Sequence, residues 1–532
     1  METTSIVLNA GFLPSEFVAD IGPVASGYAP LGNKPLLLKQ LESLPNSDRI
    51  LIAHRELDSI PAWVARHLDT RVDSVVGGRS MGESLALALT KVQDNQALRI
   101  IVADTLQTWS GTPDAITISS SASRGNWTQV VKDERGRITF IHSEFAAGSP
   151  SIVTGQFNVR DAKYLKSLIS LQTPGSVDFW AVLEQYSESN PFTVEEVNDW
   201  LDFGHLENVY ESRKAILGSR SHNEVVVSPR LTSIWKSSSD TDKLAAEVEW
   251  FSSIPQNLRV HTPQLLNVNA MRGSYELEYV GLPTVAEVML CGQLPESYWE
   301  RLFECIDNFV MLCKTSPEAP VTLTSQRISR AVHSMLVDKV VTRLEQTSQL
   351  EALWPSRIGS ARVPTPSEVV QFYLDHVASL VDSRTWEVSW IHGDLFAGNM
   401  FFDRRAGILK VVDPRGDFGG MGAYGPILYD IAKLRHSFVH GYDFLAAGFF
   451  GWDSSGPSES LVFPPNAYRD SGGVNVAMAA LETLEYRLDV DRFSVDVTEA
   501  GLFLSMLPLH GESQQRQRAA VHQGLTILRD YL

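Results

Sequence analysis

"IHGDLFAGNMFFDRRAGILKVVDPRG", residues 391–416, is the stretch that decides how the chain is interpreted. It separates Asp394 from Asn399 by four residues and ends the apolar run ILKVVD with Asp413. A carboxylate at a strand end and a loop amide can share a hard cation, which neutralises the phosphate oxygens of a nucleotide. We therefore interpret the stretch as a metal and phosphate site. The alternative is a hairpin whose acidic ends are only solvated.

The motifs of this stretch resemble a known family. D-x-x-x-x-N is the spacing by which kinase catalytic loops place a base and a magnesium ligand on one turn. HGDLFAGN followed by VVDPRG resembles the aminoglycoside phosphotransferase and choline kinase superfamily, whose members transfer the γ-phosphate of ATP to a hydroxyl or amine of a small molecule. LYDIAKLRHS, residues 428–437, extends the resemblance over about residues 216–532, and the whole run is similar to kinase-like domains of bacterial capsule and surface-polysaccharide gene products.

The resemblance implies an α+β bilobal protein-kinase-like fold that uses ATP and Mg²⁺. Asp394 would accept the proton of the acceptor hydroxyl, while Asn399 and Asp413 would hold the magnesium ion. His392 is expected to brace the backbone of the loop, and Asp430 is expected to tether it.

Upstream residues complete the implied nucleotide site. Lys236 in SIWKS stands where the family has the lysine that touches the α and β phosphates, and Glu247 would pair with it. Glu249 is a rival for this pairing, since both glutamates lie in AEVEW. SRSHN, residues 219–223, takes the place of the phosphate-covering loop but lacks its usual glycines. The alternative for the lysine and the glutamates is an ordinary solvated position.

Several further residues are candidates with two interpretations each. Glu278 and Tyr279 would form the hinge that receives adenine, or a plain strand edge. Arg415 would reach a phosphate or carboxylate, or form a structural salt bridge. Four residues would line the acceptor pocket or pack between helices: His436, His440, Tyr442 and Asp443.

The composition describes a folded protein of more than one domain. The chain has 532 residues, which is too long for one ordinary core. Hydrophobic residues make up 44% of it, which is typical of a folded protein. A net charge of −18 argues against a nucleic-acid partner. The three cysteines lack metal or disulfide spacing, and no apolar run reaches the roughly 18 residues that span a bilayer. We expect a cytoplasmic protein without a membrane span; the sequence does not predict its oligomeric state.

The front half alternates strands and helices. Residues 5–10, 49–54 and 98–104 are predicted strands, and residues 82–92 are a predicted helix, which together indicate a parallel, doubly wound α/β sheet. A hairpin is predicted around residues 134–136. VDFWAVLEQY and VEEVNDWL are predicted as helical segments. The predicted domains are 1–215, 216–295 (kinase N-lobe) and 296–532 (helical C-lobe).

Four segments of the front half resemble sugar-nucleotidyltransferases of the GT-A-like, Rossmann-like fold. They are LNAGF (8–12), PLGNKPLLLKQLESL (30–44), LRIIVADTL (98–106) and WLDFGHLENVYESRKA (200–215). The resemblance implies that Asp104 and Asp202 bind a metal ion bridging a nucleotide, CTP, UTP or GTP, and a sugar phosphate. A strand-end aspartate and a helix N-cap are the structural alternatives.

The front half also departs from that family. Its first loop should read G-x-G-x-R, yet Gly11-Phe12-Leu13-Pro14-Ser15 supplies neither the second glycine nor the arginine. Ala25-Ser26 stands where the family has Pro-Lys. Lys34 or Arg79 could supply the missing positive charge.

The sequence therefore predicts an ATP-dependent small-molecule kinase joined to a nucleotidyltransferase-like domain. Its acceptor would be a hydroxyl of a sugar, polyol or amino alcohol, and its role would be surface-polysaccharide precursor synthesis. Two alternatives stay open. The front domain is degenerate and non-catalytic, or both domains are relics of a nucleotide-binding scaffold.

Overall fold

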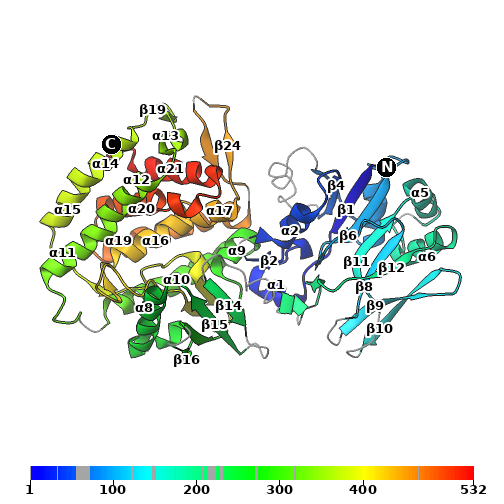
Figure 1. Cartoon of the computed structure of the whole chain (residues 1–532), viewed down its shortest axis with the longest axis horizontal. Coiled ribbons are helices and arrows are strands. Elements are labelled where there is room, and N and C mark those ends of the chain that lie inside the picture. The colour runs from blue at the N-terminus through cyan, green and yellow to red at the C-terminus, as the bar shows by residue number, and fades with distance from the viewer. Residues whose placement is uncertain are drawn as a thin grey trace. The chain divides into compact units, whose positions relative to one another are not determined.

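The computed structural model divides the chain into two compact units (Figure 1). Unit 1 comprises Met1–Ile216 and Cys291–Gln293, and unit 2 comprises Leu217–Leu290 and Leu294–Leu532. The structure describes residues 2–32, 34–55, 72–120, 125–145, 151–173, 175–205, 208–209, 211–212, 223–227, 232–269, 273–316, 319–456, 458–464 and 466–532. Most of SRSHN, the predicted phosphate-covering loop, lies outside these residues.

The centre of unit 1 is a parallel sheet that contains the three predicted strands. Its neighbours, in order, are β6 (Ala97–Val102), β1 (Thr3–Asn9), β4 (Arg49–His54) and β5 (Val72–Val76). Ile6 on β1 lies opposite Leu51 on one side and Ile100 on the other. Both faces of β1 and β4 are buried, because helices cover parallel sheets on both sides, and such strands are therefore unbroken apolar runs. The predicted α/β class is confirmed.

The same sheet continues with antiparallel strands. β11 (Ile152–Val159) pairs with β6, and β8 (Ala115–Ser119) pairs with β11. The predicted hairpin is formed by β9 (Gly125–Lys132) and β10 (Ile138–Phe145). In its turn, the Asp133 carboxylate accepts hydrogen bonds from two backbone N–H groups, each 2.9 Å long. The sheet is thus mixed, because these strands are joined by short turns instead of crossover helices.

The prediction of helix for VEEVNDWL is wrong. Thr193–Glu196 form β12, which pairs in parallel with β8. The carboxylate of Glu195 accepts hydrogen bonds from the hydroxyls of Ser110 and Thr112, and Asp199 accepts one from the backbone of Thr108. These partners are distant in the sequence and hold the segment as an extended strand. The local sequence of the segment gives no indication of them.

Short elements complete unit 1. They are α1 (Ser15–Ile21), β2 (Pro30–Leu31), β3 (Lys34–Pro35), α2 (Leu36–Ser43), α4 (Met81–Leu89), β7 (Thr105–Leu106), α5 (Ala162–Ser170), α6 (Phe179–Ser189) and β13 (Leu201–Asp202). α4 and α6 match the predicted helices. With α5 they bury a core against the sheet that includes Leu85, Leu165 and Leu183.

Unit 2 begins with a four-stranded antiparallel sheet. Its strands, in order, are β14 (Asn223–Val227), β15 (Ser233–Ser238), β17 (Ser274–Glu278) and β16 (Leu265–Asn269). The helix that carries Glu247 is α8 (Thr241–Ser252), which begins at the N-cap Asp240 and buries Leu244 and Phe251. β20 (Ser389–Trp390) directly precedes the quoted stretch, which holds the hairpin of β21 (Met400–Asp403) and β22 (Ile408–Val411).

The rest of unit 2 is mainly helical, which confirms the α+β class. Its helices are α9 (Val285–Cys291, partly in unit 1), α10 (Glu296–Lys314), α11 (Ser325–His333), α12 (Lys339–Gln346), α13 (Leu350–Leu353), α14 (Pro366–Phe372), α15 (Ala378–Ser383), α16 (Leu428–Leu434), α17 (Tyr442–Ala447), α18 (Ala467–Asp470), α19 (Gly473–Arg487), α20 (Arg492–Ser505) and α21 (Gln514–Leu528). The remaining strands are β18 (Arg357–Ile358), β19 (Ala361–Arg362), β23 (Tyr424–Gly425), β24 (Gly451–Asp453) and β25 (Ser460–Val462). Over the described residues, no helix has the length and apolar character to cross a membrane.

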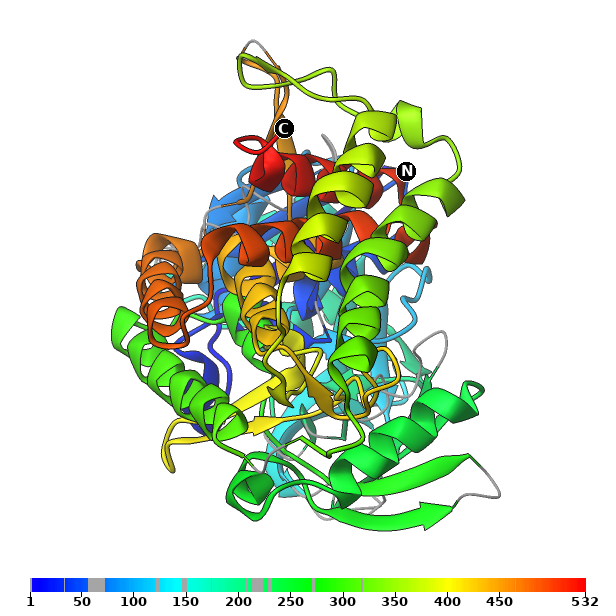
Figure 2. The same cartoon turned by 90° about the vertical axis from the view of Figure 1, so that its left-hand side faces the viewer.

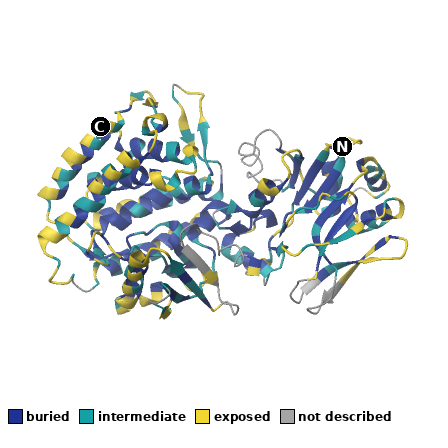
Figure 3. Cartoon of the chain, viewed as in Figure 1, coloured by how far each residue is buried: buried dark blue, intermediate teal, exposed yellow. Residues whose placement is uncertain are grey.

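Helix packing places the centre of this unit at α16 and α20. α20 contacts α21, α16 and α12, and nearly all of its residues are buried (Figure 3). Two long helical rods lie side by side, α11 with α12 and α14 with α15 (Figure 2). A π-helical turn, Ser334–Asp338, joins α11 to α12, and another, Arg435–Val439, continues α16. π-helical turns occur often at functional sites.

Candidate active site

The loop that carries Asp394 is held by its backbone. The carboxylate of Asp430, on α16, accepts hydrogen bonds from the N–H groups of His392 and Gly393 at 2.8 and 2.7 Å. Burial raises the pKa of Asp430 to about 7, although the two N–H donors act in the opposite direction. The predicted tethering role of Asp430 is therefore confirmed.

His392 braces the same loop, as predicted. Its Nδ1 accepts a hydrogen bond from the N–H of Asp394 at 3.3 Å, which leaves the proton on Nε2, and Nε2–H donates to the carbonyl of Val412 at 2.9 Å. Burial lowers the pKa of His392 to about 4, so the ring is neutral near pH 7. A neutral ring with both nitrogens engaged serves to hold the two halves of the hairpin together.

The structure brings Asp394, Asn399 and Asp413 together. The Nδ2 of Asn399 donates to the carbonyl oxygen of Asp394 at 3.0 Å and lies 3.5 Å from that of Asp413. Because Nδ2 is used in this way, Oδ1 of Asn399 is turned toward other partners. All three residues line one cavity of about 570 Å³. Asp413 has a left-handed φ of +54°, a strained conformation that occurs often at functional sites.

Lys236 forms the predicted ion pair at this cavity. Its Nζ lies 2.6 Å from Glu247 and 3.1 Å from Asp413. Glu249, the rival, is exposed on another face of α8, and Tyr275 donates a further hydrogen bond of 2.7 Å to Glu247. Burial acts to lower the pKa of Lys236, but Asp413 and Glu247 outweigh it, and the pKa is raised. Lys236 is therefore a buried, permanent cation at neutral pH.

The turn after Asp413 packs directly on α8. Gly416 has a φ of +77°, and a Cβ there would lie 2.5 Å from the carbonyl carbon of Ala246 and 2.7 Å from the N of Glu247. Since helix backbone yields little, we expect Gly416→Ala to lower the free energy of unfolding by about 2–4 kcal/mol, measured by urea denaturation.

Gly420→Ala is the matched control for this substitution. Its φ is +89°, but a Cβ there would have no described heavy atom within 4 Å. It should cost about 1 kcal/mol, from the backbone conformation alone. Equal losses in the two variants would contradict the proposed contact between the turn and α8.

Of the further candidates of unit 2, Arg415 lines this cavity, and the others do not. Glu278 ends β17, accepts a hydrogen bond from the N–H of Gln264 and pairs with Lys410, each at 3.2 Å; Tyr279 donates its N–H to Thr232. Their role toward adenine stays a prediction. The four acceptor-pocket candidates pack between helices instead: His436 stacks on Tyr442 at 4.4 Å, while His440 and Asp443 bind Glu499 and Ser437.

Sequence reasoning missed the group closest to Asp394. Lys433, on α16, places Nζ 2.8 Å from Oδ1 of Asp394. Burial acts to raise the pKa of Asp394, but Lys433 and Arg415 outweigh it and hold the pKa well below its usual range. Arg415 also donates to the carbonyl of Gly393 at 3.0 Å. The signal was present in LYDIAKL, where Lys433 follows Asp430 by three residues and so shares its helix face.

In unit 1, Asp104 and Asp202 lie side by side. Asp202 on β13 is paired with Thr105, and the N–H of Phe203 donates to the carbonyl of Asp104 at 2.8 Å. Both carboxylates converge on Gly204, where a Cβ would lie 2.7 Å from Asp104 Oδ2 and 3.3 Å from Asp202 Oδ1. Burial and then the charge of Asp202 raise the pKa of Asp104 to about 7. Two adjacent carboxylates of this kind suit a shared hard cation.

Positive charge at the first loop of unit 1 comes from a residue other than the predicted Lys34 or Arg79. Lys34 is paired with Glu42 at 2.7 Å, which engages one of the proposed substitutes. The guanidinium of Arg55 lies over the ring of Phe12, 3.7 Å from its centre. Arg55 thus brings a guanidinium to the first loop, whose own sequence has no arginine. It follows the end of β4, and the spacing of residues within the loop could not indicate it.

Comparison with known proteins gives the class of unit 2. Residues 331–459 match the sequence model of the phosphotransferase enzyme family. This segment contains Asp394, Asn399 and Asp413, so the resemblance identified from HGDLFAGN is confirmed, and the domain is a phosphotransferase. No curated protein matches the chain.

Solved structures resemble each half. Aminoglycoside phosphotransferase APH(3″)-Id from Streptomyces rimosus has 18% identity and a TM-score of 0.32, over 58% of this chain and 91% of that one. Choline kinase LicA from Streptococcus pneumoniae has 12% identity and a TM-score of 0.34, over 59% and 92%. The 4-diphosphocytidyl-2C-methyl-D-erythritol synthase from Anaerococcus prevotii has 13% identity and a TM-score of 0.29, over 40% and 96%. Likeness at this level transfers no activity.

Proposed function

We propose that unit 2 uses ATP to phosphorylate a hydroxyl group of a sugar, polyol or amino alcohol. The observation that carries this proposal is the convergence of Asp394, Asn399, Asp413 and Lys236 on one cavity of about 570 Å³. Phosphoryl transfer asks the protein mainly to position the reactants and to neutralise charge, and these four side chains suffice for both.

The transfer follows from the geometry around Asp394. The acceptor oxygen forms a bond to the γ-phosphorus of ATP while the bond to the bridging oxygen breaks, and ADP leaves with the electron pair. The hydroxyl proton passes to the Asp394 carboxylate. Lys433, whose Nζ lies 2.8 Å away, holds that carboxylate in place. The lowered pKa of Asp394 keeps the carboxylate ionised before the transfer. Asp394 therefore orients the hydroxyl first and takes its proton late.

The residues present fit a magnesium ion. The Oδ1 of Asn399 and the carboxylate of Asp413, whose side chain is 39% exposed, offer the hard oxygen ligands that Mg²⁺ prefers. The ion would neutralise charge on the phosphate oxygens of ATP when bound. Lys236 would contact the α and β phosphates, and Glu247 holds it in place.

ADP release tests this function directly. Purified protein, ATP and Mg²⁺ would be assayed with a panel of sugars, polyols and amino alcohols. The expected result is turnover with one class of acceptor, together with an ATP-dependent rise in melting temperature that requires Mg²⁺. Absence of both turnover and thermal shift would support the scaffold alternative instead.

For unit 1 we propose a nucleotidyl transfer to a sugar phosphate, from CTP, UTP or GTP. The adjacent Asp104 and Asp202 favour this activity, and the departures in the first loop favour the degenerate alternative. Together with the kinase, such an activity would activate a phosphorylated precursor for surface-polysaccharide synthesis in the cytoplasm. The proposed domains are residues 1–215, 216–295 and 296–532.

Asp104→Asn distinguishes the two states of unit 1. Without metal the substitution removes repulsion between two carboxylates, so at pH 8 we expect it to raise the stability of unit 1 by about 1–3 kcal/mol. It should also abolish any thermal shift of unit 1 that Mg²⁺ causes without ATP, and lower pyrophosphate release by about a hundredfold or more. The control is Asp73→Asn, which removes a surface ion pair with Arg49. Absence of pyrophosphate release by the wild type would favour the degenerate alternative.

A further inference from the structure

Three cations lie close to Asp394 or to the phenol of Tyr429. Lys433 lies 2.8 Å from Asp394, while Lys339 Nζ and Arg415 Nη2 lie 3.4 and 3.3 Å from the phenol oxygen of Tyr429. They come from separate parts of unit 2: α12, the turn after Asp413, and α16. Lys339 directly follows one π-helical turn, and Lys433 lies just before another.

One of the three cations has no paired anion. Lys433 is paired with Asp394, and the carboxylates of Asp394, Asp430 and Asp417 act on Arg415. Lys339, in contrast, forms no ion pair with a carboxylate of the described residues, and its hydrogen bond goes to the phenol of Tyr429. A buried cation without a partner is costly unless an anion joins it.

The titration of neighbouring groups agrees with a positive potential around Lys339 and Tyr429. Burial, followed by the charges of Arg415 and Lys433, lowers the pKa of Lys339 in spite of Tyr429. Burial acts to raise the pKa of Tyr429, but the three cations outweigh it and lower the pKa to about 8. A positive potential strong enough to acidify a buried phenol is one that attracts an anionic ligand.

The position of the lysines separates this anion from the nucleotide. The cavity that holds Lys236, Asn399 and Asp413 is lined by Asp394 and Arg415, but not by Lys339 or Lys433. Lys433 reaches Asp394 from α16, and Lys339 lies on α12. An acceptor hydroxyl bound at Asp394 would carry its substituents close to Lys433, which lies 2.8 Å from that carboxylate.

We propose that the acceptor carries a compact oxyanion, a phosphate or a carboxylate, which Lys339 and Lys433 hold beside the reacting hydroxyl. This inference rests on the proposed kinase function and names its substrate class. Arg415 donates hydrogen bonds to the carbonyl of Gly393 and to the phenol of Tyr429. It therefore connects the oxyanion site to the catalytic loop. A neutral polyol of the same shape lacks the charge that this site compensates.

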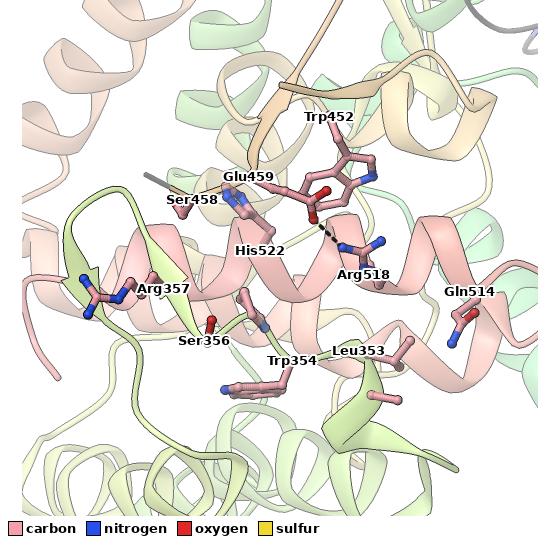
Figure 4. Close-up of a pocket in the computed structure, with 12 residues that line it drawn as sticks. Leu353, Trp354, Ser356, Arg357, Trp452, Ser458, Glu459, Gln514, Arg518 and His522 are labelled. Carbon is pink, nitrogen blue, oxygen red and sulfur yellow. Dashed lines mark hydrogen bonds and ion pairs between the residues drawn. The ribbon is translucent and has the colours of Figure 1, made fainter. Parts of the chain in front are cut away.

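A second cavity in unit 2 supplies the control for anion binding. It has a volume of about 350 Å³ and is lined by Trp354, Trp452, Arg357 and Arg518 among others (Figure 4). Arg518 is paired with Glu459 at 2.7 Å, whereas the side chain of Arg357 forms no hydrogen bond or ion pair with a described residue. An anion attracted to exposed guanidinium groups alone would bind here.

The experiment compares matched anionic and neutral compounds by calorimetry with the Mg²⁺ complex of a non-hydrolysable ATP analogue present at constant ionic strength. The pairs are glycerol 3-phosphate with glycerol, glucose 6-phosphate with glucose, and glucuronate with glucose. We expect the anionic member of at least one pair to bind about tenfold or more tightly than its neutral partner. Lys433→Met and Lys339→Met should each lose that preference, Lys433→Arg should keep most of it, and Arg357→Gln should leave it unchanged.

The outcomes separate this inference from the kinase function. Equal binding of both members of every pair overturns it, as does a preference that survives both methionine substitutions or is lost in Arg357→Gln. Lysine-dependent anion binding without ADP formation by any compound supports the oxyanion site and contradicts the kinase. ADP formation with neutral acceptors alone supports the kinase and overturns the oxyanion site.

Discussion

Replacing Asp394 with asparagine is expected to lower kcat for ADP formation by about a thousandfold or more, with little change in the affinity for ATP. The amide keeps the shape of the side chain but cannot take the hydroxyl proton, and it loses its charge toward Lys433 at 2.8 Å. The nucleotide contacts assigned to Lys236 are untouched. Steady-state ADP release and ATP titration by calorimetry measure the two quantities.

Asp403→Asn is the control for this prediction. Asp403 lies in the turn of the same hairpin, where its carboxylate accepts two backbone N–H bonds at 2.9 and 3.0 Å. An asparagine can keep both bonds, so activity should stay near that of the wild type. If Asp394→Asn retained more than about a tenth of kcat, Asp394 would not be the base.

The parts of the site that were predictable are those fixed by short-range geometry. HGDLFAGN and VVDPRG lie within one hairpin, so two strands and a turn are enough to bring Asp394, Asn399 and Asp413 together. The choice of Glu247 over Glu249 also follows from helix geometry, since Glu247 shares the buried face of Leu244 and Phe251. The predicted strands of unit 1 were equally clear as buried apolar runs.

The parts that were missed depend on distant partners. Thr193–Glu196 form a strand because β8 offers an edge, and the hydroxyls that bind Glu195 come from more than 80 residues earlier. Lys339 reaches Tyr429 across 90 residues of sequence. Arg55 lies beside the first loop of unit 1 only because β4 neighbours β1. Such contacts follow from packing, which no local pattern records.

Lys236→Met is expected to reduce both activity and stability. Loss of the cation should lower kcat/KM for ATP by about a hundredfold, since charge-assisted contacts to phosphate are lost. It also leaves Glu247, which is 2% exposed, with the hydroxyl of Tyr275 as its remaining side-chain donor among the described residues. An unpaired buried carboxylate costs about 3–5 kcal/mol, which should lower the melting temperature of unit 2 by roughly 6–10 °C.

The double variant Lys236→Met with Glu247→Gln separates the two effects. Because glutamine carries no charge, it should restore roughly half of the lost melting temperature, while the activity toward ATP stays as low as in the single variant. Lys314→Met serves as the control, since Lys314 pairs with a glutamate whose side chain is 79% exposed and should contribute little. Recovery of activity along with stability in the double variant would mean that Lys236 acts only through folding. Persistent inactivity in a restabilised protein would place Lys236 at the nucleotide phosphates.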